Sequence, residues 1–490
     1  MNGIRGDAGL DAIVVGAGPN GLAAAVTLAR SGLRVRVYER ADQPGGGVST
    51  RELTLPGFQH DVCSAVHPMA FESRFFREFM LRERVEFVTP EVSFAQPLEH
   101  GRAAVAHRDL ARTRDNLGVD GPAYERLMRP LVEHSTRIAD FTGSTLLRIP
   151  RHPLTAAAFG LRALEQGTPA WNLRFREDAA PALLTGVAAH SILAQPSIAG
   201  AGAALALITY AHAGGWPIPV GGSQSITDAL LADLRAHGGE VVLDHEVASL
   251  AELPSSTVTL LDVTPKALIR MTGDAMPGRY RRALEAFRYG DGVAKVDFAL
   301  NAPVPWTNPD LRRAGTVHVG GTRAEMADAE NQVHRGRHPE RPYVLVSQPS
   351  LFDASRAPAG MHALWTYTHV PAGSSLDRQE AIVRQIERFA PGFRDTIVAA
   401  SSRSALEVEA HNPNYPGGDI AAGSPDLWQL LRRPVLSPDP WRTPMRGVYL
   451  ASASASPGPG VTGMPGWLAA LSALRHEFGT RMLPDLSPRG

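Results

Sequence analysis

Residues 11–50 decide the fold, and they read DAIVVGAGPNGLAAAVTLARSGLRVRVYERADQPGGGVST. The apolar, uncharged residues 12–15 are typical of a strand buried on both faces of a parallel sheet. Alanine and leucine dominate residues 22–29, which predicts a helix that stops at Ser31-Gly32. Residues 34–38 predict a second strand. This order of strand, turn, helix and strand indicates the first unit of a parallel α/β sheet.

Glycines fill the turn between the first strand and the helix. Gly16, Gly18 and Gly21 have the spacing GxGxxG, which allows a tight turn and lets a pyrophosphate approach the backbone. The N-terminus of the following helix offers unpaired N–H groups and the positive end of its dipole. Glu39, at the end of the second strand, is placed to accept hydrogen bonds from an adenosine ribose. The stretch therefore predicts a dinucleotide site.

A second glycine run, residues 45–47, brings the backbone close to a bulky ligand again. Glutamate, a short spacer, paired glycines and a hydroxyl residue together resemble the flavoproteins of the amine-oxidase and phytoene-desaturase superfamily. The motifs TLPGF at 54–58 and CSAVHP at 63–68 narrow the resemblance. They are similar to phytoene-dehydrogenase-like FAD oxidoreductases, in the subgroup of the pyridine nucleotide-disulfide oxidoreductase domain-containing type 2 proteins. The resemblance implies FAD as the cofactor.

The same resemblance implies an α/β fold in which a Rossmann-like FAD-binding domain is interleaved with an α+β substrate domain. Residues 1–75, 215–290 and 440–490 would form the FAD-binding domain, and residues 76–214 and 291–439 the substrate domain. Residues 258–263 are expected to close the nucleotide-binding sheet. The implied FAD contacts are Gly16, Gly18, Pro19, Asn20, Gly21, Glu39, Arg40, Gly46, Gly47, Val48, Val247, Ser454, Gly460, Val461 and Met464.

The C-terminal stretch 447–474, GVYLASASASPGPGVTGMPGWLAALSAL, predicts a strand, a glycine-rich turn and a helix. In the family that it resembles, this helix points its N-terminus at the flavin ring. Three positions depart from the family pattern. Gly47 stands where many members have arginine, and Thr462 and Pro465 stand where subgroup members have histidine and cysteine.

Composition excludes several classes of function. The 490 residues carry 49 basic and 49 acidic side chains, so no basic field favours nucleic acid. The single cysteine, Cys63, excludes an internal disulfide and a CxxC redox pair. No metal site is expected, because Gly336 and Pro339 argue against a helix that would pair His334 with His338. Without a basic and then apolar leader, we expect a cytoplasmic protein.

Residues 179–227 contain no Asp, Glu, Lys or Arg. Their longest clean apolar run, residues 198–211, is too short to span a bilayer, so no transmembrane segment is expected. Three interpretations stay open for this segment: a buried core helix, the wall of a channel for an apolar substrate, or peripheral docking on a membrane surface.

Lys295 is the first catalytic candidate. It lies in YGDGVAKVDFAL at 289–300, where Val293, Lys295 and Asp297 share one face of a predicted strand. This setting is similar to the strand on which amine-oxidase relatives carry a lysine that reaches the flavin through a water. The alternative is a surface lysine that shares an exposed face with Asp297.

Three further catalytic candidates have structural alternatives. Tyr367 and His369 alternate with Trp365 on a predicted strand, so these side chains line either a substrate site or a packed aromatic ladder. His67, in the segment HDVCSAVH at 60–67, is either a base near the flavin or a histidine satisfied by the backbone. Cys63, in the same segment, is either a small buried residue or a thiol near the ring.

These features together predict hydride abstraction from a C–H bond of a small, largely apolar organic substrate. The GxGxxG at 458–463 has no second βαβ unit after it, so we expect oxygen, a quinone or another carrier rather than NAD(P)H as the redox partner. Two alternatives stay open: a flavin-binding protein with a structural or regulatory role, and a redox-neutral isomerase or cyclase. The sequence leaves the oligomeric state open.

Overall fold

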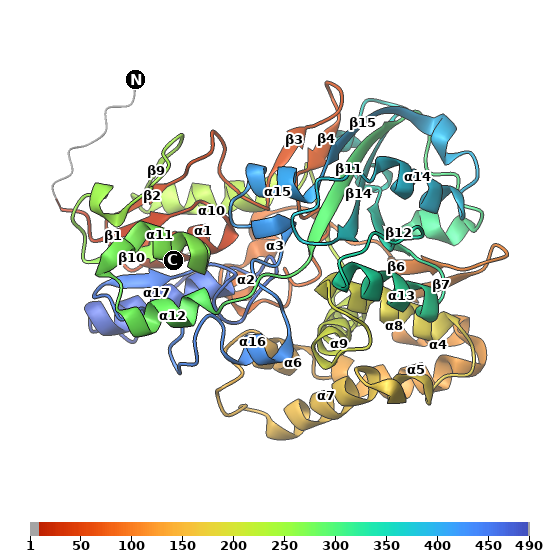
Figure 1. Ribbon diagram of the computed structural model, residues 1–490, viewed down its shortest axis with the longest axis horizontal. Helices are drawn as coiled ribbons and strands as arrows, with labels where there is room; N and C mark the ends of the chain where they lie inside the picture. Colours follow the sequence, from red (N-terminus) through yellow and green to blue (C-terminus); the bar gives the residue numbers. More distant parts are fainter. Residues whose placement is uncertain (1–8, 489–490) are drawn as a thin grey trace.

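The computed structural model describes residues 9–488. The first sheet has five parallel strands, and the N-terminal strand lies at its centre. The strand order is β16-β10-β1-β2-β9, and Figure 1 shows these strands together although they come from distant parts of the chain. Their bounds are β1 (Ala12–Val15), β2 (Val35–Tyr38), β9 (Glu240–Val242), β10 (Val258–Leu261) and β16 (Val448–Leu450). The predicted parallel α/β sheet is confirmed. β10 does not close it, however, because the returning strand β16 pairs with the outer side of β10.

The first helix, α1 (Pro19–Ala29), begins directly after the glycine turn and therefore earlier than the predicted residue 22. Gly18 is its N-cap in extended backbone, with φ −70° and ψ 175°. Pro19 fits the first turn, because its missing N–H would have had no partner inside the helix. The free N–H groups of α1 thus lie at the glycine turn.

Three helices cover the parallel sheet as one packed layer. α1 contacts both α10 (Gln224–Ala236) and α17 (Met464–Glu477), and side chains such as Leu22, Leu230 and Trp467 join one buried cluster with the strands. Phe76 and Leu81 belong to the same cluster, so this part of the chain packs with the sheet beyond the predicted domain boundary at residue 75. The remaining helices here are α2 (Arg74–Glu78), α3 (Leu81–Arg84), α11 (Pro265–Thr272) and α12 (Gly278–Glu285).

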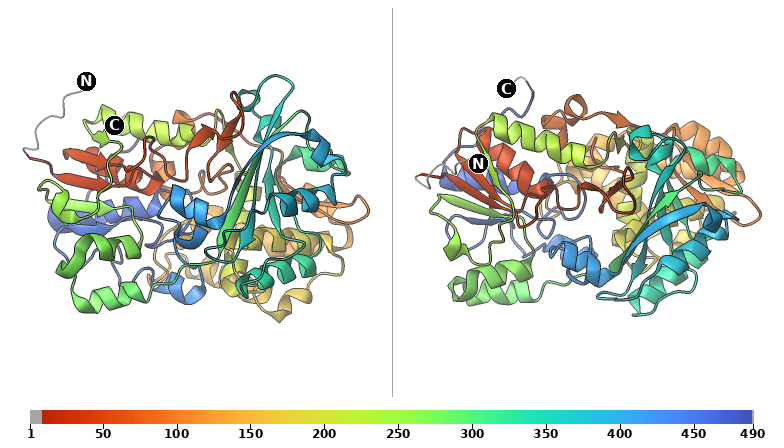
Figure 2. Two further views of the ribbon diagram at one scale, coloured as in Figure 1. Left: turned by 45° about the horizontal axis from the view of Figure 1, so that its top comes forward. Right: turned by 90° about the horizontal axis from the view of Figure 1, so that it is seen from above.

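A seven-stranded mixed sheet forms the second half of the molecule, in the order β15-β11-β14-β13-β12-β6-β7. The pair β6 and β12 is parallel, and its other neighbouring strands are antiparallel. Both views of Figure 2 show this sheet standing beside the nucleotide-binding half. Its strands are β6 (Val92–Pro97), β7 (Ala103–His107), β11 (Gly292–Leu300), β12 (Ala314–Val319), β13 (Val344–Ser347), β14 (His362–Val370) and β15 (Ile397–Arg403).

Alternation along β11 divides the second half into two cores. Val293 packs in one cluster with Trp365, Tyr367 and helices of the 121–213 region, whereas Val296 packs in another cluster with α14. The helices around this sheet are α4 (Leu110–Asn116), α5 (Gly121–Val132), α6 (Ser135–Thr142), α7 (Pro153–Gln166), α8 (Ala179–Ala188), α9 (Ile198–Ala213), α13 (Arg323–His334), α14 (Gln379–Glu387), α15 (Ala405–His411) and α16 (Leu427–Leu431). Two small sheets pair β3 (Thr50–Glu52) with β4 (Gln59–Asp61), and β5 (Phe87–Val88) with β8 (Ile218–Pro219).

The uncharged stretch 179–227 forms α8, α9 and the start of α10. Most of α8 and α9 is buried against each other and against β6 and β7, so the core-helix interpretation describes the greater part of this segment. Residues of both helices also line a cavity with Arg323. Large exposed apolar side chains lie outside this stretch, on and beside α7, where Ile149 is 93% and Leu154 86% exposed. Within residues 9–488, no helix combines the length and apolar character needed to cross a bilayer.

Candidate functional site

A pocket lies where the second glycine loop meets the seven-stranded sheet. It brings Lys295 and Tyr367, two of the predicted catalytic residues, together with Gly46. Cys63 also faces it, so this residue is more than a small buried side chain in the core. The complete lining is Gly46, Val62, Cys63, Val293, Lys295, Tyr367, Arg403, Val408, His411, Tyr415 and Ile420.

Lys295 is buried, not a surface lysine. Its side chain has 5% of its area exposed, and its amino group donates to the carboxylate of Asp297, which is 4% exposed. Burial lowers the pKa of Lys295 and raises the pKa of Asp297, and the attraction between the two opposes both shifts. Asp297 Oδ1 also lies 3.7 Å from Nδ1 of His60, whose pKa burial lowers to about 3, so that ring is neutral. The surface-lysine alternative is wrong because Asp297 gives the buried ammonium a partner.

The two glycine loops are in contact with each other. Gly45 N donates to Ala17 O at 2.9 Å, and a Cβ on Gly46 would lie 3.3 Å from Gly18 Cα. Glu39 fixes the first loop, since its Oε2 accepts from Ala17 N at 2.7 Å and its Oε1 from Ala41 N at 2.9 Å. These glycines thus form a cradle of bare backbone at the N-terminus of α1.

Asp262 follows β10 and lies at this same N-terminus. Its Oδ2 accepts from Gly21 N at 2.9 Å, and a Cβ on Gly18 would lie 2.9 Å from that oxygen. Burial, with Glu39 as a second negative charge, raises the pKa of Asp262 to about 7. Next to it, Asn20 Oδ1 is buried and has no hydrogen-bond partner within residues 9–488. Open N–H groups and bare glycine backbone fit the pyrophosphate of a dinucleotide.

The other predicted FAD contacts surround this cradle. Val48 is buried behind the second loop, where its carbonyl accepts from Thr227 Oγ1 at 2.7 Å, and Val247 is buried in the nucleotide-binding core. Arg40 is exposed after β2. Ser454 Oγ donates to Ala422 O at 2.6 Å. Whether these residues contact FAD stays a prediction.

The C-terminal turn explains two departures from the family pattern. Thr462 Oγ1 accepts from Met464 N at 3.2 Å at the start of α17, and Pro465 occupies the first turn of that helix. Both residues therefore stabilise the helix start. Gly460, with φ +124°, and the partly buried Val461 come just before it.

The third departure, Gly47, also has a steric explanation. A side chain at position 47 would collide with the hydroxyl of Tyr415, which is hydrogen-bonded to the Cys63 thiol. The tyrosine from the loop 411–423 takes the space that a longer residue at 47 would need. Sequence reasoning missed Tyr415, since its only signal was a proline- and glycine-rich loop.

His67 does not line the pocket. Its Nε2 is hydrogen-bonded to Ser223 Oγ at 2.8 Å, and burial lowers its pKa to about 4. Ser223 N in turn donates to Asp61, so His67 belongs to a buried polar network between the two halves of the molecule.

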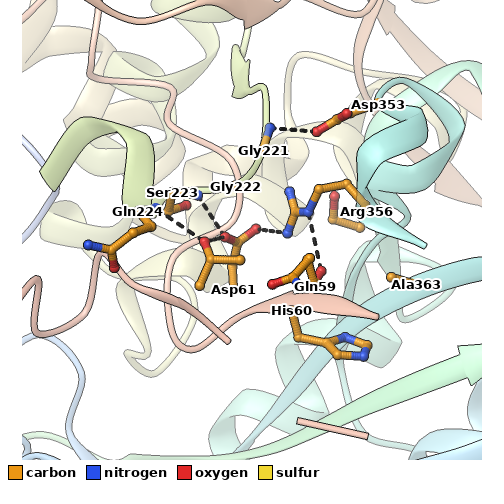
Figure 3. Close-up of polar contacts among 12 residues, drawn as sticks. Gln59, His60, Asp61, Gly221, Gly222, Ser223, Gln224, Asp353, Arg356 and Ala363 are labelled. Atoms are coloured by element: carbon orange, nitrogen blue, oxygen red, sulfur yellow. Dashed lines mark hydrogen bonds and ion pairs between the residues drawn. The ribbon is translucent and has the colours of Figure 1, made fainter. Parts of the chain in front are cut away.

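Asp61 is the centre of that network, as Figure 3 shows. Its Oδ1 accepts from Thr50 Oγ1 at 2.7 Å and from Ser223 N at 2.8 Å, and its Oδ2 accepts from Arg356 Nη2 at 2.6 Å. Burial alone raises the pKa of Asp61, but Arg356 and the two other donors bring it below its ordinary value. Asp61 is thus a structural anion, not a free base.

His369 also lies away from the pocket lining. Its Nδ1 is 2.8 Å from both carboxylate oxygens of Glu330, and its ring lies 5.6 Å from that of Tyr367. Trp365 and Tyr367 are in edge contact at 5.1 Å, so the three side chains form the packed ladder. Of the three, only Tyr367 also faces the pocket.

Arg403 is a pocket residue that sequence reasoning missed. It is opposite Lys295 in the pairing of β15 with β11, and its guanidinium makes no close ion pair with a carboxylate of residues 9–488. Only the strand register brings it to Lys295, and a register between distant strands leaves no local signal.

Comparison with known proteins agrees with this geometry. Residues 14–80 match the NAD(P)-binding Rossmann-like domain family. Pyridine nucleotide-disulfide oxidoreductase domain-containing protein 2 of Rattus norvegicus is 24% identical over 94% of this chain and 92% of its own length. The zeta-carotene-forming phytoene desaturase of Myxococcus xanthus is 26% identical over 92% of this chain and 90% of its own length.

Among solved structures, putrescine oxidase bound to putrescine superimposes with a TM-score of 0.60 at 19% identity, over 95% of this chain and 99% of that one. At this identity the likeness concerns the fold. The chain is therefore homologous to pyridine nucleotide-disulfide oxidoreductase domain-containing protein 2 and to phytoene desaturase, and it has the fold of the amine oxidases with a Rossmann-like domain of the FAD-binding type.

Proposed function

We propose that this chain is an FAD-dependent oxidoreductase that removes hydride from a C–H bond of a largely apolar organic molecule. The pocket between Gly46 and Lys295 is the observation that carries the proposal, because it joins the nucleotide-binding loop to the seven-stranded sheet. The relatives support the class of reaction, since one of them is a phytoene desaturase.

The pocket walls suit an apolar substrate. Val62, Val293, Val408 and Ile420 supply its aliphatic surface. Such walls exclude water and hold a C–H bond at a fixed distance from a reactive group. FAD supplies the hydride acceptor when it is bound.

Lys295 is the proposed proton-handling residue. Loss of hydride from one substrate atom leaves a proton to be removed from a neighbouring atom, and the amino group of Lys295 faces the pocket. Only the neutral amine can accept that proton; burial lowers the pKa of Lys295 and so makes its ammonium easier to deprotonate, while the ion pair with Asp297 opposes this shift. Tyr367, whose pKa burial raises, stays neutral and positions the substrate through its hydroxyl.

The cofactor is tested first. The purified protein should show the visible bands of oxidised flavin and release stoichiometric FAD on denaturation. A colourless protein that does not take up FAD would contradict the proposal. Anaerobic addition of apolar substrates should then bleach the flavin, and oxygen or a quinone should restore it. Product without bleaching would indicate a redox-neutral enzyme.

Lys295→Met tests the proton-handling role. It should lower the rate constant of anaerobic flavin reduction by about 10²–10⁴-fold while the FAD content stays stoichiometric. Lys266→Met is the matched control, since Lys266 is the other lysine of the chain and lies exposed on α11. Equal rates in both variants would show that Lys295 takes no part in the reaction.

A further inference from the structure

Helix α7 turns an apolar side to the outside of the molecule, and Figure 1 shows this helix at the outer edge. Its leucines at positions 154, 161 and 164 are 86%, 68% and 47% exposed. Spacings of three and four residues place these leucines and Ala157 on one side of the helix. All exposed residues of α7 are apolar, and they are Pro153, Leu154, Ala157, Leu161 and Leu164.

The opposite side of α7 packs into the core. Phe159 and Ala163 belong to the same buried cluster as Tyr210 of α9, and α7 also contacts α5 and α6. The helix is therefore apolar on both sides, although a helix that borders water normally carries polar residues on its outer side. Within residues 9–488, no element covers the outer leucines. Exposed apolar side chains that gather in this way mark a contact surface for something outside the chain.

The apolar surface continues beyond both ends of the helix. Ile149, four residues before the first helical residue, is 93% exposed, and Leu173 is 84% exposed. Arg174 forms an ion pair with Glu165 in the last turn of α7, which holds Leu173 beside the end of the helix. The α7 surface is defined here as Ile149, Leu154, Leu161, Leu164 and Leu173.

The charge at the α7 surface is positive. Residues 141–164 contain three arginines and neither Asp nor Glu. Arg148 and Arg151 are exposed on either side of Ile149 and pair with no carboxylate of residues 9–488. The one acidic residue of α7, Glu165, is neutralised by Arg174. Protruding apolar side chains thus lie next to positive charge that the described chain does not neutralise.

We propose that the α7 surface docks on an anionic lipid bilayer, with its leucines in the acyl boundary and Arg148 and Arg151 at the lipid phosphates. Apolar side chains beside basic residues are the combination that holds a helix in the plane of a membrane surface. Attraction to anionic lipid adds to the burial of the leucines. The 14 residues of α7 are too few to cross a bilayer, so the helix would lie along it.

A bilayer suits this surface better than a second protein does. Side chains such as Ile149 and Leu173 protrude almost completely, so a rigid partner would need a matching hole for each, whereas lipid chains adapt to them. A second copy of this chain, in a two-fold contact, would bring the same unpaired arginines together and so place like charges face to face. The docking does not depend on the flavin chemistry proposed above.

Co-sedimentation of the purified full chain with lipid vesicles tests the proposal. The chain should bind vesicles made of equal parts phosphatidylglycerol and phosphatidylcholine. Vesicles of phosphatidylcholine alone should bind it about tenfold more weakly, because they offer no net negative charge to the two arginines. High salt should weaken binding to the anionic vesicles, since it screens the attraction between arginine and phosphate.

Variants locate the contact. Leu154→Glu should lower the partition coefficient on the anionic vesicles at least tenfold, because it places a carboxylate in the acyl boundary. Leu376→Glu is the matched control: Leu376 is 51% exposed in the loop between β14 and α14, and the same change there should leave binding as in wild type. Arg151→Gln should weaken binding to the anionic vesicles about fivefold and leave binding to phosphatidylcholine unchanged. All three side chains are exposed, so the variants should fold.

Four results would overturn the proposal. A chain that pellets with neither kind of vesicle does not dock on lipid. Equal binding to both kinds would show that the arginines do not recognise lipid charge. Equal losses in Leu154→Glu and Leu376→Glu would place the contact elsewhere on the molecule. A dimer in sedimentation velocity that Leu154→Glu dissociates would show that a second copy covers the α7 surface.

Discussion

At the scale of single residues, Lys295 and Asp297 form an ion pair from which water is almost excluded. Lys295→Met should destabilise the protein by about 3–5 kcal/mol, because it leaves the Asp297 carboxylate buried without a partner. The double variant Lys295→Met, Asp297→Leu should recover most of that loss, since two apolar residues leave no buried charge. The free energy of unfolding in urea measures both. Equal losses in the single and double variants would mean that the two groups are not coupled.

Asp262 should make stability depend on pH. Its pKa is about 7 in the folded chain against an ordinary value of 3.8, so the folded state binds the proton more tightly than the unfolded chain. The stability that Asp262 contributes is complete below pH 4 and is lost as pH rises through 7. Relative to Asp262→Asn, the free energy of unfolding of the FAD-free protein should therefore fall by about 4 kcal/mol between pH 4 and pH 8, at 1.36 kcal/mol per pKa unit.

Urea unfolding at several pH values checks this difference. Asp228→Asn, which removes an exposed carboxylate on α10, is the control for the change of net charge. A difference between wild type and Asp262→Asn that stays constant from pH 4 to pH 8 would show that Asp262 titrates alike in both states.

At the scale of helices and strands, α1 and α17 cross so closely that one glycine permits the contact. A Cβ on Gly466 would overlap the carbonyl oxygen of Asn20. Gly466→Ala should therefore separate the helices and lower stability by about 1–3 kcal/mol, as overpacking does. Because Asn20 lies in the glycine cradle, the same variant should weaken FAD binding, measured by quenching of flavin fluorescence.

Gly160→Ala is the matched control for that change. Gly160 lies inside α7, and nothing lies within 4 Å of the position that its Cβ would take. Alanine there should stabilise the helix by about 0.5–1 kcal/mol and leave FAD binding unchanged. If both variants behaved alike, helix propensity and not the close crossing would explain the effect at Gly466.

The elements also show what the sequence could predict. β1, the glycine turn, β2 and α17 follow from local patterns, because hydrophobic runs and glycine positions act within a few residues. The sequence prediction ended the parallel sheet at β10 and missed β16 beyond it, because β16 lies almost 190 residues after β10 in the chain. Lys295 was predicted from the sequence of its own strand. The burial of Lys295 beside Asp297 and its position opposite Arg403 depend on strand pairing.

At the scale of the whole molecule, Asp61 joins the two halves. It lies on β4 and binds Ser223, which precedes α10 of the nucleotide-binding half, and Arg356, which lies between β13 and β14 of the other half. The side chains of Asp61 and Arg356 are both 0% exposed. Gly221 N adds a second link by donating to Asp353 Oδ2 at 2.8 Å. The pocket between Gly46 and Lys295 is formed by residues of both halves, so its geometry depends on this junction.

Arg356→Met should therefore affect more than local stability. It leaves Asp61 buried and uncompensated, which costs about 3–5 kcal/mol. The halves should then unfold in separate steps, visible as non-coincident urea transitions by circular dichroism and by flavin release. Arg384→Met is the matched control, because Arg384 forms a surface pair with Glu380 and should change stability by no more than about 0.5 kcal/mol. A single cooperative transition in Arg356→Met, with FAD affinity unchanged, would show that the halves are held together without the Asp61 network.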